Sequence, residues 1–315
     1  MSERDTVLRL VRGAEAAIDA ARQRIDDLNV YPVPHGDTGA NLAATMREVV
    51  LALEASPAAD RTELAAETSR AALMGARGTS GLILSQIVRG LAETIAAESE
   101  VDGAAVARAL RAGSEAAYRA VREPVEGTML STVRALAEAA ERSQGEPMSA
   151  LLERLVEEGE AAVARTPNQL DVLREAGVVD AGAVGLVELL RGVAAAVTGE
   201  RLAAFSPPAA PERASQSVDH PLSGFRYCTT FVVEGELDTA AIETALEALG
   251  DSLLVVGDGS ALKVHLHTDD PGAALTVATG RGTIDNVAIS DLHRQSTKRE
   301  RRLALVPEDP TGPAE

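Results

Sequence analysis

The sequence has few aromatic residues, one cysteine and no long apolar run. Its 315 residues include no Trp, three Phe and three Tyr. So few aromatic side chains argue against a stacking platform for single-stranded nucleic acid. One cysteine excludes an internal disulfide framework and is typical of a reducing compartment. No apolar run approaches the ~20 residues of a membrane-spanning helix, and the opening residues MSERDTVLRL lack the apolar segment of a signal peptide. We therefore expect a cytoplasmic protein without a transmembrane segment.

Positive charge is also scarce. Lys and Arg together number 30 against 48 Asp and Glu, which gives a formal net charge of −18. This balance argues against nonspecific binding to nucleic acid or to an anionic membrane surface. The short basic run KRERR at 298–302 is expected to be a solvated face. An acidic chain that binds an anion needs local devices, namely glycine loops, helix N-termini or a metal ion.

Residues 1–198 show helical periodicity throughout. Apolar residues recur every three or four positions, and Pro or Gly, Pro167 included, separates the repeats. The spacing predicts an all-α bundle or helical barrel of about eight helices. The predicted helical ranges are 7–28, 41–53, 61–74, 81–97, 103–121, 128–142, 148–165 and 180–197.

The rest of the chain predicts a second, smaller domain. Residues 199–224 are rich in proline and small residues, as expected of a linker. Residues 225–295 predict the order β-α-β-β-α-β, a ferredoxin-like split βαβ domain. Residues 296–315 are predicted to be a charged tail, disordered at its end.

The segment NVYPVPHGDTGANL, residues 29–42, has the composition of a phosphate–metal site. Gly36 and Gly39 permit close backbone approach to a ligand. Asp37 offers the hard oxygen that Mg²⁺ prefers, and the helix predicted from Asn41 presents free N–H groups to the loop. A capped turn between helices is the alternative.

Three further segments place glycine, hydroxyl or carboxylate groups at predicted helix starts. They are GARGTSGLILSQ (75–86), PVEGTMLSTV (124–133) and VVDAGAVGL (178–186). Taken alone, the first is better explained by close helix packing and the second by a capped core helix, and the third is ambiguous. If alternate helices of the bundle point the same way, however, all four starts meet at one end. The sequence therefore predicts a mouth lined by helix N-termini, suited to a polyphosphate.

Together these motifs resemble the nucleotide-binding domain of the dihydroxyacetone kinase L-subunit type. NVYPVP before GDTG, with the later YCTTF, GDSLLVVGD and KVHLHTDDPG, resembles the kinase subunit of bacterial fatty acid kinase. The resemblance covers residues 5–292. It implies an eight-helix barrel that binds ATP through Mg²⁺ and phosphorylates the carboxylate of a fatty acid on a separate acyl-binding partner. Full-length members carry a further C-terminal domain implicated in docking that partner.

The resemblance also implies roles for individual residues. It makes Asp37 a Mg²⁺ ligand and catalytic group, with Asn29 nearby. It assigns the phosphates to Thr38, Gly39 and Asn41 and the glycine loop to Gly78, Thr79, Ser80 and Gly81. It places Thr128 and Met129 near the adenine, while Asp180 and Gly182 close the site.

One residue departs from the family pattern. The family has Asp-Gly-Asp where this chain has His35-Gly36-Asp37. Imidazole is a poorer Mg²⁺ ligand than carboxylate and brings no negative charge. His35 is still placed with Asp37 as a catalytic residue and with Asn29 and Asp37 as a Mg²⁺ ligand, and we expect it to weaken metal binding and to lower or abolish kinase activity. Two alternatives stay open: an ATP-binding regulatory module without turnover, and the nucleotide-binding subunit of a dihydroxyacetone kinase.

The second domain has a candidate zinc site of its own. Cys228 lies on the first predicted strand, and His265 and His267 lie two apart on the third, so that they share a face. The first and third strands are neighbours in the predicted topology, which brings a thiolate and two imidazoles together, a three-residue ligand set typical of Zn²⁺. A buried cysteine and solvated histidines are the alternative. The residue after Cys-Thr, usually Glu in the family, is Thr230. The oligomeric state stays open, a homodimer included.

Overall fold

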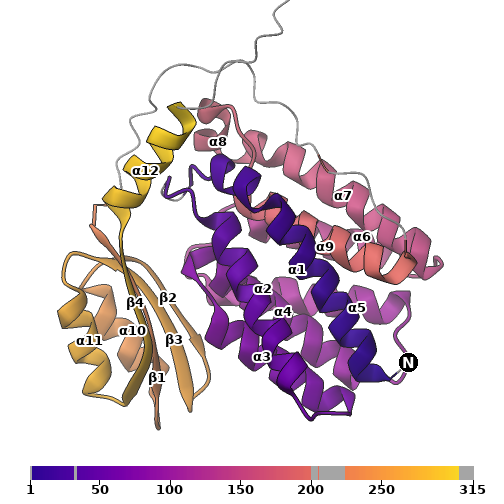
Figure 1. Ribbon diagram of the computed structural model, residues 1–315, viewed down its shortest axis with the longest axis horizontal. Coiled ribbons are helices and arrows are strands. Elements are labelled where there is room, and N and C mark those ends of the chain that lie inside the picture. The colour runs from indigo at the N-terminus through magenta and orange to yellow at the C-terminus, as the bar shows by residue number, and fades with distance from the viewer. Residues whose placement is uncertain (1, 32–33, 200–204, 206–223, 305–315) are drawn as a thin grey trace, which may run out of the picture.

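A computed structural model describes residues 2–31, 34–199, 205 and 224–304. An N-terminal helical part lies beside a small sheet, one face of which turns toward the helices (Figure 1). This confirms the predicted fold class, an all-α domain followed by a small α/β domain. The expected linker, residues 199–224, falls almost entirely outside the described residues.

Within the described residues, eight long helices form a closed ring. Each packs against the next and the last returns to the first, which gives the expected eight-helix barrel. At the closing contact Gly13 and Gly192 bring two helix backbones together, because a Cβ on either would overlap the other's carbonyl oxygen. The helices are α1 (Glu3–Leu28), α2 (Thr38–Ala55), α3 (Arg61–Gly75), α4 (Gly78–Ala97), α5 (Gly103–Ala120), α6 (Met129–Ser143), α7 (Met148–Gln169) and α9 (Ala181–Thr198).

One predicted helix break is wrong, and two helices were not predicted. Pro167 does not end a helix but lies in the last turn of α7. The Thr166 hydroxyl donates to the Val163 carbonyl at 2.7 Å and so replaces the N–H that proline lacks. The short helix α8 (Asp171–Ala176) was not predicted; Gly177 ends it in the left-handed conformation. The tail expected from residue 296 begins as a helix, since α12 spans Leu292–Ala304.

Helix α9 is the one helix among the described residues that is long and apolar enough to cross a bilayer, and 67% of it is buried inside the protein. It packs in the ring between α1 and α7. Its two charged residues are paired there: Glu188 accepts from Arg24 at 2.5 Å, and Arg191 donates to Glu160. Because α9 is part of the barrel wall, most of it is buried, which accounts for its apolar composition.

The C-terminal domain has the predicted ferredoxin-like order. Its sheet is antiparallel, with strand order β2-β3-β1-β4. In the register, Cys228 lies opposite His267 and Thr230 opposite His265. The elements are β1 (Tyr227–Glu234), α10 (Thr239–Glu247), β2 (Asp251–Gly257), β3 (Ala261–Thr268), α11 (Pro271–Thr279) and β4 (Thr283–Asp291).

Both faces of β3 are buried. Leu262, Val264 and Leu266 pack into a core with α10 and α11. The opposite face carries Lys263, His265 and His267, with exposures of 3%, 1% and 2%. The solvated histidines considered as an alternative are therefore excluded.

The helical barrel covers this polar face. Leu254 and Val256 of β2 pack with Ala76 and Leu82 of the barrel. Lys263 Nζ donates to the Met74 carbonyl at 2.7 Å. One wall of any site between the domains is thus the polar face of β3.

Candidate functional site

Two adjoining cavities lie where the barrel meets the sheet. The first has a volume of about 330 Å³ and the second about 590 Å³, and both are lined by Tyr31, Thr38, Thr79 and Ser80. The starts of α2 and α4 line the first, and the starts of α6 and α9 line the second. Four sequence segments that are far apart along the chain therefore meet at one place.

The loop before α2 is held by Asn29. Its side-chain oxygen accepts the backbone N–H groups of Gly36 at 3.0 Å and Asp37 at 3.3 Å, and its amide nitrogen donates to the Tyr31 carbonyl at 3.2 Å. Gly36 takes the left-handed conformation (φ 67°) that this turn requires. Asn29 thus positions Asp37 in addition to lining the cavity.

Asp37 is a half-buried carboxylate at the start of α2. Its side chain does not cap the helix. Burial raises its pKa to about 6, and the neighbouring Asp26 adds to the rise, against a hydrogen bond with Asn41 that lowers it. Asp26, which sequence reasoning missed, is itself buried and accepts the Ala40 N–H at 3.0 Å. One buried and one half-buried carboxylate close together favour a cation between or beside them.

The predicted glycines have different roles. Gly78 has φ 57° and lies against the Asn41 side chain, so a side chain here would be both strained and crowded. Gly39 packs against the Arg22 backbone of α1, and Gly81 packs against Thr45 of α2. Neither of these two is among the residues lining the cavities. Thr38, Asn41, Gly78, Thr79 and Ser80 do line the first cavity.

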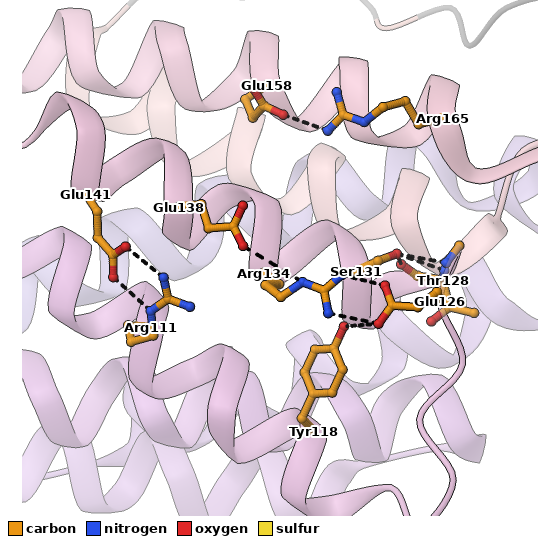
Figure 2. Close-up of polar contacts among 11 residues, drawn as sticks. Arg111, Tyr118, Glu126, Thr128, Ser131, Arg134, Glu138, Glu141, Glu158 and Arg165 are labelled. Atoms are coloured by element: carbon orange, nitrogen blue, oxygen red, sulfur yellow. Dashed lines mark hydrogen bonds and ion pairs between the residues drawn. The ribbon is translucent and has the colours of Figure 1, made fainter. Parts of the chain in front are cut away.

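The start of α6 is fixed by a network of polar contacts (Figure 2). Arg134 donates to both oxygens of Glu126, at 2.8 and 2.5 Å, and the Tyr118 hydroxyl donates to Glu126 at 3.0 Å. The Thr128 and Ser131 side chains form a capping box at the same turn. This network holds Thr128 and Met129 against the second cavity.

Asp180 lies at the start of α9 and lines the same cavity. It is buried, its Oδ2 accepts the Ala183 N–H at 2.7 Å, and burial raises its pKa to about 6. Gly182 lies beside it on the cavity wall. The carboxylate therefore caps α9 and lines the cavity together with Thr128 and Met129.

Cys228, His265 and His267 form one cluster on the sheet side. One ligand atom from each lies within 4.8 Å of the other two. His265 Nδ1 is 3.6 Å from Cys228 Sγ, and its Nε2 is 3.1 Å from Thr79 Oγ1 of the glycine loop. Burial lowers the pKa of both imidazoles and raises the pKa of the thiol to about 12. Two neutral imidazoles and a sulfur suit Zn²⁺, which would also stabilise the thiolate.

His35 lines the same cavity and reaches this cluster. Its ring lies edge-on to that of His267, with centroids 5.7 Å apart. Its Nε2 is buried and has no hydrogen-bond partner among the described residues. Burial lowers its pKa to about 3, so the ring is neutral.

Arg77 and Lys263 also line the first cavity and were missed by the motif analysis. Burial lowers the pKa of Lys263 to about 8. Its sequence signal was its place on the same alternating face of β3 as the two histidines. Arg77 lies within the glycine-rich segment but carries no motif of its own.

Comparisons with known proteins agree with these motifs. The DAK2 domain family matches residues 32–195, and the middle domain of FakA-like fatty acid kinases matches residues 224–299. The chain belongs to the DAK2-domain family. It is 35% identical to Protein YloV of Bacillus subtilis, covering 92% of this chain and 55% of that protein. An uncharacterized protein of Staphylococcus aureus is 34% identical, covering 94% and 57%.

The chain thus spans little more than half the length of these curated relatives. Among solved structures, the dihydroxyacetone kinase of C. freundii in complex with AMP-PNP and Mg²⁺ is 20% identical. Its TM-score is 0.47, over 60% of this chain and 33% of that chain.

Proposed function

We propose that this chain is the ATP-binding kinase module of a fatty acid kinase. In this proposal it transfers the γ-phosphate of ATP to the carboxylate of a fatty acid held by a separate protein, giving acyl phosphate. The convergence of four helix starts on two adjoining cavities is the observation that carries the proposal. The match of the second domain to the middle domain of FakA-like fatty acid kinases supports the choice of acceptor.

The residues at the cavities suit a nucleotide triphosphate. Asp37 would hold Mg²⁺, and the N-termini of α2 and α4 would bind phosphate oxygens. Asn29 would act by positioning Asp37, since its amide oxygen already accepts two loop N–H groups. Catalysis would rest on positioning and charge neutralisation, as phosphoryl transfer generally does. Thr38, Asn41, Gly78, Thr79 and Ser80 would surround the phosphates.

The second cavity suits the nucleoside end. Met129 offers an adaptable apolar contact for a purine face, and the network around Glu126 fixes the turn that presents it. Thr128, Asp180 and Gly182 line the same wall. Cys228, His265 and His267 would hold Zn²⁺ on the sheet side of the first cavity.

Binding and turnover are tested separately. Titration calorimetry of the chain with MgATP should give a saturable heat that the Asp37→Asn variant loses. Incubation of the chain with ATP and a fatty-acid-loaded acyl-binding protein should give acyl phosphate, which hydroxylamine traps as a hydroxamate. Absence of MgATP binding in the folded wild-type chain would refute the nucleotide site.

Two other outcomes would point to the alternatives. Tight MgATP binding with no turnover, even with loaded partner, would indicate a regulatory module, which the replacement of a family Asp by His35 favours. ATP-dependent phosphorylation of dihydroxyacetone itself would indicate a dihydroxyacetone kinase subunit. The presence of the second domain argues against that assignment.

A further inference from the structure

We propose that His35 is the fourth protein ligand of the metal centre formed by Cys228, His265 and His267. One zinc ion would then join the loop before α2 to the sheet and close the centre to solvent. The inference deepens the zinc part of the proposed function and is independent of ATP binding.

The three sheet ligands leave one coordination position unfilled. Cys228 comes from β1 and the two histidines from β3, all on the face that the barrel covers. A tetrahedral zinc with three protein ligands keeps its fourth position open, whereas a structural zinc fills it with a fourth side chain. Because the barrel lies over this face, its side chains can supply a fourth protein ligand.

His35 is a barrel imidazole beside that position; it lies outside the 4.8 Å group of the other three ligands, so its ring would move inward on metal binding. It lines the same cavity as the three ligands, and its Nε2 is buried with no partner in the described part of the chain. With Zn–N bonds of about 2.0–2.1 Å and tetrahedral angles, two imidazoles on one zinc have ring centroids about 5 Å apart. The centroids of His265 and His267 are 5.0 Å apart, and those of His35 and His267 are 5.7 Å apart.

One ring nitrogen of each strand histidine lies near a protein oxygen: that of His265 is hydrogen-bonded, whereas His267 Nδ1 has no hydrogen-bond partner within the described residues. His265 Nε2 contacts the Thr79 hydroxyl at 3.1 Å, and His267 Nδ1 lies 3.5 Å from Asp251 Oδ1. Metal-bound histidines usually direct the second ring nitrogen to such an oxygen, which fixes the ring orientation. His265 Nδ1, beside Cys228 Sγ, is then its metal-binding atom, and either ring nitrogen of His267 can complete the set.

The assignment also explains why histidine is tolerated at position 35. A buried imidazole is a poor Mg²⁺ ligand and a good Zn²⁺ ligand. Asp37 lies two residues away on the same loop and keeps the magnesium role. A closed zinc centre at this place would fix the loop bearing Asp37 against the sheet. Thr79 of the glycine loop contacts His265, one of the zinc ligands.

The test compares His35→Gln with His293→Gln, which makes the same change at an exposed histidine of α12. Zinc X-ray absorption of the whole wild-type chain should show three imidazole nitrogens and one sulfur. In competition with a chromophoric chelator, His35→Gln should bind zinc at least about tenfold more weakly. The His293→Gln variant should match the wild type.

Cobalt substitution reports whether the centre is open. Added azide should leave the visible spectrum of Co²⁺-loaded wild type and His293→Gln unchanged and should shift that of His35→Gln. Two imidazoles with an oxygen ligand in the wild type, an azide response of the wild type, or unchanged zinc affinity of His35→Gln would each overturn the proposal. The wild-type measurements decide the matter even if His35→Gln does not fold. MgATP calorimetry on the same samples shows separately whether the nucleotide proposal fails.

Discussion

Replacing the Asp37 carboxylate by an amide should stabilise the metal-free chain while removing the proposed magnesium ligand. Burial raises the pKa of Asp37 from an ordinary value of 3.8 to about 6. At pH 8 the carboxylate is ionised in both states. Its ionised form is less favourable in the folded chain than in the unfolded chain. At ~1.4 kcal/mol per pKa unit, the cost is about 3 kcal/mol. The amide of the Asp37→Asn variant would not bear this cost and could keep the hydrogen bond with Asn41.

The sign of the pH dependence follows from the raised pKa. Below pH 3.8 the carboxyl is protonated in both states and costs nothing. Between pH 3.8 and about 6 the folded chain holds the proton longer, so the wild type loses stability as the pH rises through this window. Above about pH 6 the difference in free energy of unfolding between the wild type and Asp37→Asn reaches its full value. Asp180, whose pKa is also about 6, changes the stability of both chains by the same amount. It therefore does not affect the difference between them.

The assay is urea unfolding of both chains with EDTA and no nucleotide, at pH 4.5 and pH 8. We expect Asp37→Asn to be more stable by about 2–3 kcal/mol at pH 8 and by clearly less at pH 4.5. Asp19→Asn is the control, since the Asp19 side chain is 60% exposed on α1. A difference that is the same at both pH values, or a less stable variant at pH 8, would refute the reasoning.

Three further predictions concern other parts of the chain. If position 35 faces the magnesium instead of the zinc, His35→Asp should raise Mg²⁺-dependent ATP turnover, because a carboxylate is the harder ligand; a zinc-bound His35 predicts no such gain across a magnesium titration. Arg134→Met leaves Glu126 without its bidentate partner, so the thermal melting temperature should fall by about 2–4 °C and MgATP should bind more weakly. An unchanged ATP affinity would show that the turn before α6 needs no such support. Gly192→Ala forces a Cβ onto the Gly13 carbonyl and should lower the free energy of unfolding by about 1–3 kcal/mol, measured in urea.

Much of the fold follows from short-range patterns. The long barrel helices and the βαββαβ order were predicted because their apolar residues repeat with clear periods. Pro167 was misread because the compensating Thr166 hydroxyl bond depends on helix geometry. Helix α8, at six residues, is too short to show a period. Helix α12 has a polar composition that also suits a solvated tail.

The sequence located some parts of the candidate site and missed others. The motifs located the helix starts, since loop glycines and capping residues are local features. They also assigned Gly39 and Gly81 to the ligand, whereas both pack against neighbouring helices. The contacts of His35 and Lys263 depend on how the sheet packs against the barrel, which no local pattern encodes. Asp26 was missed because a single acidic residue after the buried Ile25 does not differ in sequence from a surface carboxylate.

An acidic chain can still bind a polyphosphate because its net charge and the groups in contact with the ligand act over different distances. The formal charge of −18 is spread over the whole chain, and solvent-exposed charges are screened beyond about 8 Å at physiological ionic strength. A bound phosphate would instead contact groups at hydrogen-bond distance in a buried cavity, where screening is weak. The cavity walls carry the N-termini of α2 and α4 together with Arg77 and Lys263. The net charge therefore bears on how fast an anion approaches at low salt, while these local groups and the metal ligands determine whether it stays bound.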